Sequence, residues 1–187
     1  MFLEALILVV MLGGMLLIVG YTVVTGISPL PSTRLGQELV IAALPDELEG
    51  TVIEAGSGWG GLARAVGRRC PRARVIGYEL SPLPWLFACL LQWIRPVPNV
   101  EFRRRDLRQV SFRDARAVVC YLHLEAIREL EPRWRRELPA GALVVSNTFR
   151  IPGWQPCAVH RPPVRLDAPV YLYRIPRACR ARLDVCG

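Results

Sequence analysis

The feature that most constrains the fold is a run of glycines placed directly after a short apolar segment. Residues 51–55 are apolar or β-branched apart from Glu54, and an amphipathic helical stretch begins at Leu62. The glycines between them are Gly56, Gly58, Gly60 and Gly61. Glycines allow a tight turn in which a ligand approaches the backbone closely, and the first turn of a helix offers free N–H groups. The sequence therefore predicts a strand, a ligand-binding loop and a helix, in this order.

Two known loop patterns fit these glycines. Gly56, Gly58 and Gly61 satisfy the G-x-G-x-x-G pattern of dinucleotide-binding proteins. Gly56, Gly58 and Gly60, preceded by Glu54, satisfy the (D/E)-x-G-x-G-x-G loop of class I S-adenosylmethionine-dependent methyltransferases. A purely structural turn is the third interpretation, and the loop alone leaves all three open.

Acidic residues after the next two predicted strands separate the patterns. Glu79 follows the strand expected at 74–78, where a carboxylate can accept hydrogen bonds from ribose hydroxyls in either class. Asp106 follows the strand expected at 100–103, where methyltransferases of this class use an acid to bind the adenine amino group. The sequence therefore favours S-adenosylmethionine, with neutralisation of the arginines at 103–105 as the alternative role of Asp106.

Short β-like segments alternate with helical ones along the rest of the chain. The expected strands are 51–55, 74–78, 100–103, 117–121, 142–147 and 170–175, with 156–161 pairing with the last as a hairpin. Helices are expected to begin near Trp59, Pro82 and His123. This alternation predicts an α/β fold, a Rossmann-like, doubly wound, mostly parallel sheet with a C-terminal antiparallel hairpin.

The N-terminal segment is a second strong signal. Residues 5–24 contain no charged residue, and at 1.5 Å per residue they would span roughly 30 Å, the thickness of a bilayer's hydrocarbon core. A cleaved signal peptide would have basic residues before a shorter apolar run, whereas Glu4 precedes this one. We therefore expect one transmembrane helix. Because Arg34 and the other cations follow it, the positive-inside rule predicts a single-pass protein with its main domain on the cytoplasmic side.

These patterns divide the chain into four parts. The expected parts are a transmembrane anchor at 1–26, a connector with a short helix at 27–50, a catalytic domain at 51–176 and a basic tail at 177–187. The short helix is expected at 37–44, behind a proline-containing connector.

Charge and cysteine content exclude several classes of function. All 24 cations are arginine, and 16 acids leave a net charge of +8. A chain without lysine cannot use a Schiff base, a P-loop lysine or the Tyr-x-x-x-Lys pair of many nicotinamide-dependent oxidoreductases. The arginines are interleaved with acids and no zinc-finger or RNP pattern accompanies them, so a membrane is favoured over nucleic acid as partner. The six cysteines form no C-x-x-C pair, so neither a metal site nor a disulfide framework is expected.

Several segments together resemble one small family. Residues 54–60, 77–82 (Gly-Tyr-Glu-Leu-Ser-Pro) and 106–107 resemble membrane-anchored class I methyltransferases. That group includes the mitochondrial lysine methyltransferases of the ATP synthase c-subunit and the adenine nucleotide translocase, with bacterial relatives. The N-terminal apolar segment, the Pro-Ser-Thr connector at 31–33 and the Ile-Pro-Gly-Trp turn at 151–154 extend the resemblance over nearly the whole chain.

The resemblance implies a role for each candidate site residue. The backbone of Gly56, Gly58 and Gly60 would pass beneath the methionine part of the cofactor, which Glu54 would orient. Glu79 would bind the ribose, and Asp106 and the backbone of Leu107 would bind the adenine. Tyr121 would lie near the methyl group that is transferred. His123 is a candidate base, although methyl transfer does not require one and a loop histidine without catalytic role is the alternative. No metal is expected. The segment at 120–123 lacks the Asn-Pro-Pro-Tyr motif of many amide- and base-methylating enzymes, which disfavours those acceptors.

The sequence thus predicts an S-adenosylmethionine-dependent N-methyltransferase that acts on a membrane-proximal acceptor such as a protein lysine. Methylation of a lipid or small molecule keeps the same fold and remains an alternative. A membrane-tethered binding module that retains the cofactor pocket without activity is the non-enzymatic alternative. The oligomeric state cannot be inferred from these patterns.

Overall fold

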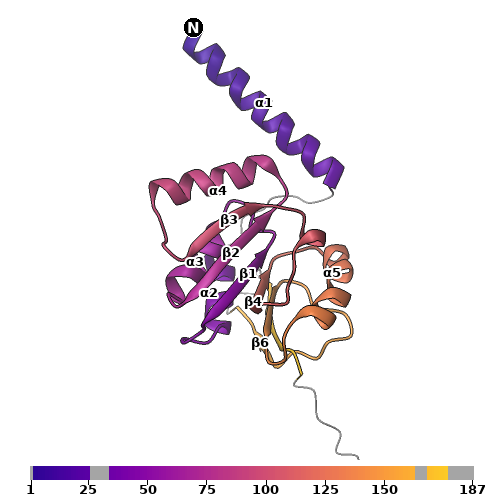
Figure 1. The fold of residues 1–187 in the computed structure, drawn as a ribbon. Coiled ribbons are helices and arrows are strands. Elements are labelled where there is room, and N and C mark those ends of the chain that lie inside the picture. Colours follow the sequence, from indigo (N-terminus) through magenta and orange to yellow (C-terminus); the bar gives the residue numbers. More distant parts are fainter. Residues whose placement is uncertain (1, 26–33, 163–167, 177–187) are drawn as a thin grey trace, which may run out of the picture.

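A seven-stranded sheet forms the centre of the molecule (Figure 1). This computed structural model describes residues 2–25, 34–162 and 168–176. The strands lie in the order β3-β2-β1-β4-β5-β7-β6. The first five strands in this order, β3, β2, β1, β4 and β5, are parallel to one another, and β7 is antiparallel to both β5 and β6. Their bounds are β1 Gly50–Ala55, β2 Ala73–Glu79, β3 Val100–Arg104, β4 Ala115–Cys120, β5 Leu143–Asn147, β6 Ala158–His160 and β7 Val170–Arg174.

Helices cover both faces of the sheet, because alternate residues of the central strands point to opposite sides. Val52 packs into one core with α2, α3 and α4, whereas its neighbour Ile53 packs into a second core with α5. Trp134 of α5 is fully buried in that second core. The helix bounds are α1 Phe2–Thr25, α2 Arg34–Ala43, α3 Gly61–Arg69, α4 Pro82–Ile94 and α5 Leu124–Glu137, with a single 3-10 turn, η1, at Leu107–Gln109.

The structure confirms the expected architecture. All the expected strands form, including the C-terminal antiparallel hairpin, although β6 is shorter than expected and β4 begins two residues earlier, at Ala115. The short helix expected at 37–44 forms as α2. Residues 26–33, which include the proline-containing start of the expected connector, and the basic tail at 177–187 lie outside the described residues.

The N-terminal apolar segment forms a helix, α1, as expected. In Figure 1 it projects away from the sheet, and its described side chains, among them Phe2, Leu6 and Leu12, are exposed. Within the part of the chain that the structure describes, no helix combines the length and the apolar character needed to cross a membrane. The predicted transmembrane span at 5–24 is therefore not supported.

Candidate functional site

The predicted site residues come together at the carboxyl edge of the parallel strands. In the sheet, Ala55 at the end of β1 lies opposite Tyr78 of β2 on one side and Cys120 of β4 on the other. The chain segments that leave these three strands therefore start side by side. In an open α/β sheet this edge is where ligands bind.

The glycine loop begins with two hydrogen bonds to the neighbouring strand. The amides of Gly56 and Ser57 both donate to the carbonyl oxygen of Tyr78, at 3.0 and 2.9 Å. Gly56, Gly58 and Gly60 all have positive φ values, of 79°, 51° and 81°. Residues with a Cβ rarely adopt this conformation, so the turn between β1 and α3 requires glycine.

Close packing adds a second requirement at two of the glycines. A Cβ on Gly60 would lie 2.6 Å from Cζ of Phe102 and 2.8 Å from Cβ of Ala88. A Cβ on Gly56 would lie 2.9 Å from Cδ2 of Leu122. A Cβ on Gly58 would meet no atom within 4 Å. The loop therefore packs closely against its surroundings at Gly56 and Gly60, whereas Gly58 between them faces open space.

Glu79 fixes the middle of this loop. Its Oε2 accepts a hydrogen bond of 2.8 Å from the amide of Gly58, and its Oε1 accepts one of the same length from the amide of Ser81. Each oxygen keeps a further lone pair. The carboxylate is thus oriented before any ligand arrives, and it can still accept bonds from a pair of neighbouring hydroxyls such as those of a ribose.

Glu54 is a buried carboxyl group with an unsatisfied atom. Its side chain is 4% exposed on β1, and Oε2 has no hydrogen-bond partner among the described residues. Burial raises the pKa of Glu54 well above its ordinary value, a backbone hydrogen bond from Ala63 lowers it, and the charge of Glu79 raises it further. Such a group is costly without a partner. A cation bound beside it would supply that partner, which is the role expected for the amino group of the cofactor's methionine part.

Asp106 lies at the end of the same edge, directly before η1. It accepts a hydrogen bond of 2.9 Å from the amide of Arg108, and its carboxylate pairs with the Arg108 guanidinium at 2.7 Å. Hydrogen bonds from Arg108 lower the pKa of Asp106, so the carboxylate is ionised and can only accept. The ion-pair partner of Asp106 is thus Arg108, whereas Arg103, one of the three arginines that Asp106 would neutralise in the alternative role, pairs with Glu101.

Leu107 follows in the turn, where its side chain packs against the second core and its carbonyl accepts a bond of 3.0 Å from Arg133. The turn that carries Asp106 is therefore fixed to α5. The expected adenine contacts of Asp106 and Leu107 remain predictions.

Tyr121 and His123 follow β4 on the neighbouring segment. Both side chains are half-buried, and His123 is the N-cap residue of α5 without a side-chain capping bond. Tyr121 comes directly after Cys120, whose strand position is opposite Ala55 at the start of the glycine loop. The topology thus brings Tyr121 to the same edge as the glycine loop, which is consistent with a position near the reacting groups. Its catalytic role and that of His123 remain predictions.

Sequence reasoning missed the corresponding segment after β5. Ser146 lies opposite Cys120, and both it and Asn147 are buried. Thr148 follows with φ of 76°, an uncommon conformation for a β-branched residue. Its amide donates to the carbonyl of Pro169 at 2.9 Å, which fixes this turn against the approach to β7. The strand-end rule that identified Glu79 would also have identified Asn147, but no local signal predicts the backbone strain at Thr148.

Solved structures with the same fold support this description. The chain aligns with an RNA methyltransferase from Salinibacter ruber, solved in complex with S-adenosyl-L-homocysteine, with a TM-score of 0.72 and 24% identity. That alignment covers 83% of this chain and 99% of the Salinibacter chain. A precorrin-6y C5,15-methyltransferase from Geobacter metallireducens aligns with a TM-score of 0.56 and 13% identity, over 73% of this chain and 85% of its own. At these identities the likeness shows the fold alone.

Curated sequences give closer matches. The adenine nucleotide translocase lysine N-methyltransferase of Mus musculus is 39% identical over 113 residues, which are 59% of this chain and 48% of the mouse protein. The lysine N-methyltransferase of the ATP synthase c-subunit from Xenopus laevis is 32% identical over 108 residues, 57% of this chain and 47% of its own. The chain thus spans about half the length of the curated relatives it matches.

A family model decides the assignment. The model of the ANTKMT methyltransferase domain matches residues 54–158, which include the glycine loop, Glu79, Asp106, Tyr121 and His123. Together with the curated relatives, this match agrees with the enzyme class predicted from the sequence. The chain belongs to the ANTKMT methyltransferase domain family.

Proposed function

We propose that this chain methylates the ε-amino group of a lysine in a protein located at a membrane. One observation carries the cofactor part of the proposal. The orphaned Oε2 of buried Glu54 and the preoriented carboxylate of Glu79 lie on adjacent strands beside the glycine loop. A ligand with a cationic amino group and a ribose diol satisfies both at once, and S-adenosylmethionine has both groups.

The residues present fit that cofactor part by part. Glu54 would bind the amino group of its methionine part, and Glu79 would accept bonds from the two ribose hydroxyls. Asp106, ionised beside Arg108, would accept a hydrogen bond from the adenine amino group. When bound, S-adenosylmethionine supplies a methyl group on a positively charged sulfur, which an unprotonated amine can displace in line.

The remaining task of the protein is to position the acceptor. In-line displacement needs the nucleophile and the methyl carbon held in one orientation, and no general base is required if the amine arrives unprotonated. Tyr121 and His123 follow β4, and Thr148 follows Asn147, the last residue of β5. Because β4 and β5 are parallel neighbours, with Cys120 opposite Ser146, these two segments leave the sheet side by side at the same edge. We propose that these two segments border the acceptor site.

The proposed acceptor rests on the curated relatives and on the surface of the chain. Both relatives are named as lysine N-methyltransferases, one of the adenine nucleotide translocase and one of the ATP synthase c-subunit. Exposed apolar side chains on α1 and α4 support a location at a membrane. The cytoplasmic location expected from the sequence stays a prediction.

The test is transfer of a tritiated methyl group from S-adenosylmethionine into membrane and soluble fractions, followed by acid hydrolysis and chromatography of the amino acids. We expect label in methylated lysine from membrane proteins. Label that the enzyme transfers to itself cannot appear as methylated lysine, because the sequence contains no lysine. Label found only in lipid or in small molecules would overturn the lysine proposal. Cofactor binding without any transfer would indicate a binding module.

A further inference from the structure

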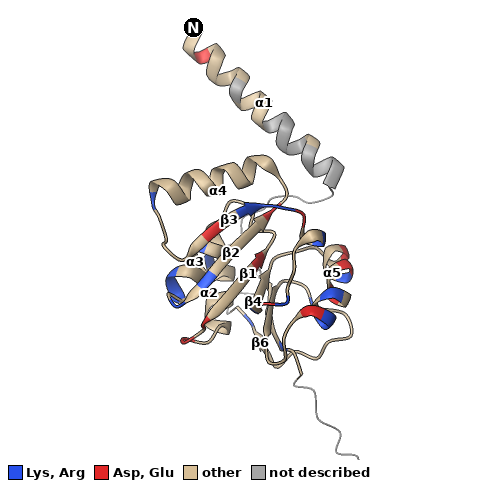
Figure 2. Ribbon diagram, in the orientation of Figure 1, with Lys and Arg blue, Asp and Glu red and all other residues tan. Residues whose placement is uncertain are grey.

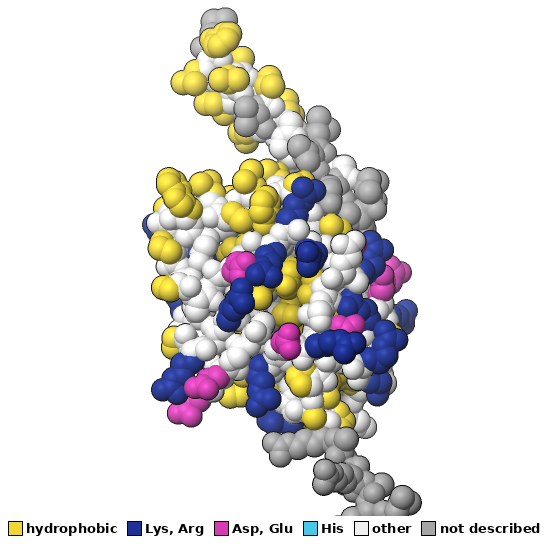
Figure 3. Space-filling view, viewed as in Figure 1, with side chains coloured by type: hydrophobic (Ala, Val, Ile, Leu, Met, Phe, Trp, Pro, Cys, Tyr) yellow, Lys and Arg dark blue, Asp and Glu magenta, His cyan; other side chains and the backbone are white. Residues whose placement is uncertain are grey.

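Helix α4 exposes a continuous apolar row. The five residues of this row are Leu86, Phe87, Leu90, Trp93 and Ile94. Each is at least 47% exposed, and Trp93 is 81% exposed. Their spacing of three and four residues places them on one side of the helix, along about 12 Å of its length. Figure 3 shows hydrophobic side chains gathered along this helix at the top of the domain.

The row does not result from a loosely packed helix. The opposite side of α4 packs into the first core through Ala88, which is fully buried. At the C-terminal end, the buried Arg64 donates to the carbonyls of Leu91 at 3.3 Å and Arg95 at 2.5 Å. The side chain of Gln92 donates to the carbonyl of Val97 at 2.7 Å. The helix is therefore fixed on its inner face while its outer face has no covering element among the described residues.

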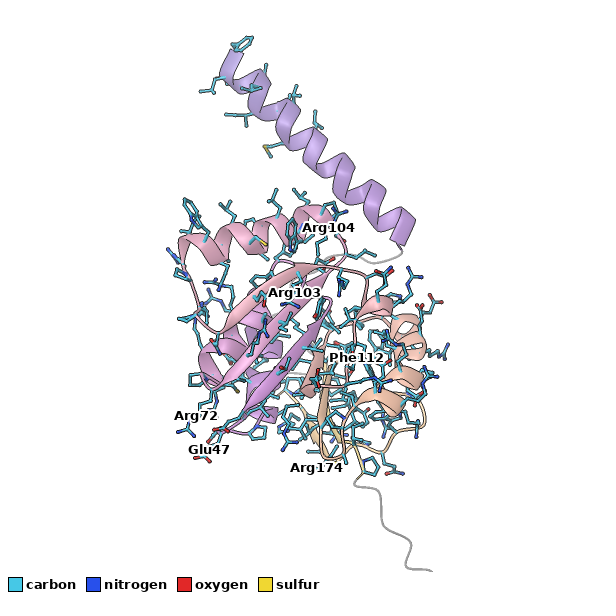
Figure 4. All side chains as sticks on the ribbon, in the orientation of Figure 1. Glu47, Arg72, Arg103, Arg104, Phe112 and Arg174 are labelled. Carbon is cyan, nitrogen blue, oxygen red and sulfur yellow. The ribbon has the colours of Figure 1, made fainter. Side chains whose placement is uncertain are left out.

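Helix α4 and the residues directly next to it in the sequence carry no negative charge. Residues 80–100 contain no acid, and Figure 2 shows α4 without a charged residue along its length. Exposed arginines lie at its two ends. Arg95 follows the last turn, and Arg104 donates to the carbonyl of Leu80, just before the first turn, at 3.3 Å. Figure 4 shows Arg104 beside that end of the helix.

We infer that the outer face of α4 docks on the surface of an anionic lipid bilayer. An apolar row of Leu, Phe, Trp and Ile between cations and without acids has the composition of a helix that lies in the membrane interface. Anionic headgroups complement arginines at both ends, and Trp prefers the depth of the headgroups. The second exposed apolar helix of the chain, α1, adds a further contact of the same chemistry.

Docking at this face would place the cofactor loop at the membrane. Phe87 of the row packs edge-to-face against Trp59 of the glycine loop, with ring centroids 5.3 Å apart. This inference deepens the proposed function, because it supplies the surface that brings the active site to a membrane-embedded lysine. The docking itself can be measured without any methyl transfer.

The test uses the full chain with vesicles of phosphatidylcholine and phosphatidylglycerol at a ratio of about 7 to 3 that contain brominated lipid, which quenches nearby tryptophan. The signal of Trp93 is obtained by subtracting the emission of the Trp93→Phe variant. We expect at least a twofold loss of this signal, and a smaller loss with phosphatidylcholine alone. If the chain binds the vesicles but the fluorescence of Trp93 is not quenched, the inference is wrong, because α1 alone would then account for binding.

A second pair of variants tests the face without relying on one residue. Leu86→Glu/Leu90→Glu adds two negative charges to the row, and Ala140→Glu/Gln155→Glu adds the same charge at exposed positions outside it. Only the first should abolish quenching of Trp93, while both should bind S-adenosylhomocysteine as the wild type does. If the first instead turns a dimer into a monomer and leaves quenching unchanged, the face is a contact between copies and the inference fails. Absence of lysine methylation would overturn the proposed function and leave this result unaffected.

Discussion

The amide of Gly58 donates a 2.8 Å hydrogen bond to Oε2 of Glu79, although the two residues are 21 positions apart. The bond ties the middle of the glycine loop to the end of β2. The other carboxylate oxygen accepts from Ser81, at the start of α4. A single side chain therefore connects the middle of the glycine loop to the first turn of the helix that carries the apolar row, and both of its oxygens are the ones proposed to bind the ribose.

Replacement of Glu79 by Gln tests this arrangement. The amide group offers one acceptor oxygen and places an N–H group against one of the two backbone donors, so we expect a loss of about 1–3 kcal/mol of stability. Affinity for S-adenosylhomocysteine should fall about 10- to 100-fold, since 1.4 kcal/mol is tenfold. Calorimetry and urea unfolding give the two values. Glu101→Gln is the matched control on neighbouring β3, where the carboxylate pairs with Arg74, and should leave the affinity unchanged. Equal affinity of wild type and Glu79→Gln would refute the ribose role.

The glycines of the loop should differ in their tolerance of alanine. Gly60→Ala combines a left-handed φ with contacts below 3.0 Å to Phe102 and Ala88, so we expect a loss of about 3 kcal/mol or more. Gly58→Ala faces open space and should cost only about 1–2 kcal/mol, the conformational penalty. Gly153→Ala, also left-handed and in open space, is the control for that penalty alone. Urea unfolding of the three variants checks the order, and equal losses would contradict it.

Asp106→Asn should change which base the site prefers. The pKa of Asp106 is held low by Arg108, so its carboxylate can accept a hydrogen bond from the adenine amino group but cannot donate one. An amide can also donate, which suits the carbonyl of hypoxanthine. We expect the ratio of affinities for S-adenosylhomocysteine and S-inosylhomocysteine to fall about tenfold or more. Calorimetry with both ligands measures the ratio, and an unchanged ratio would remove Asp106 from the adenine site.

Most of the fold could be predicted because its signals are local. The alternation of short apolar segments with helical ones identified the parallel strands, and the positions of two acids directly after the second and third strands identified Glu79 and Asp106. Contacts that depend on three-dimensional packing could not be predicted. Arg108, two residues after Asp106, pairs with it because η1 turns the chain back, whereas the sequence offers Arg103–Arg105 equally well.

The exposed face of α4 could not be predicted from the sequence either. Residues 82–94 are apolar on nearly every side, so the sequence does not reveal which side the sheet covers. The exposed row becomes visible only once Ala88 is seen facing the core. For the N-terminal segment, the sequence predicted more than the structure supports. An uncharged run was sufficient to predict its helix, but the predicted membrane span is not supported among the described residues.

Glu54 has an energetic cost in the ligand-free protein. Burial raises its pKa well above the ordinary value of 4.5, so the folded chain keeps this proton to a higher pH than the unfolded chain does. Above pH 4.5 the unfolded chain therefore binds fewer protons than the folded one. The contribution of Glu54 to the free energy of unfolding therefore decreases as pH rises, by up to about 1.4 kcal/mol per pH unit, until the pH passes the pKa of the folded state.

Glu54→Gln should remove this dependence. We expect the ligand-free variant to be more stable than the wild type at pH 7 by about 1 kcal/mol or more, and the difference to shrink toward pH 4.5. Affinity for S-adenosylhomocysteine should nevertheless fall, because the amide cannot pair with the amino group as a charge does. Urea unfolding at several pH values and calorimetry give both quantities. Glu101→Gln is the control with the opposite sign, because hydrogen bonds from Arg103 lower the pKa of the native Glu101 carboxyl. This variant should be less stable than the wild type at pH 7, and the difference in stability should shrink as the pH falls below 4.5. A Glu54→Gln variant that is less stable at pH 7 and binds the ligand normally would show a structural role in place of the proposed one.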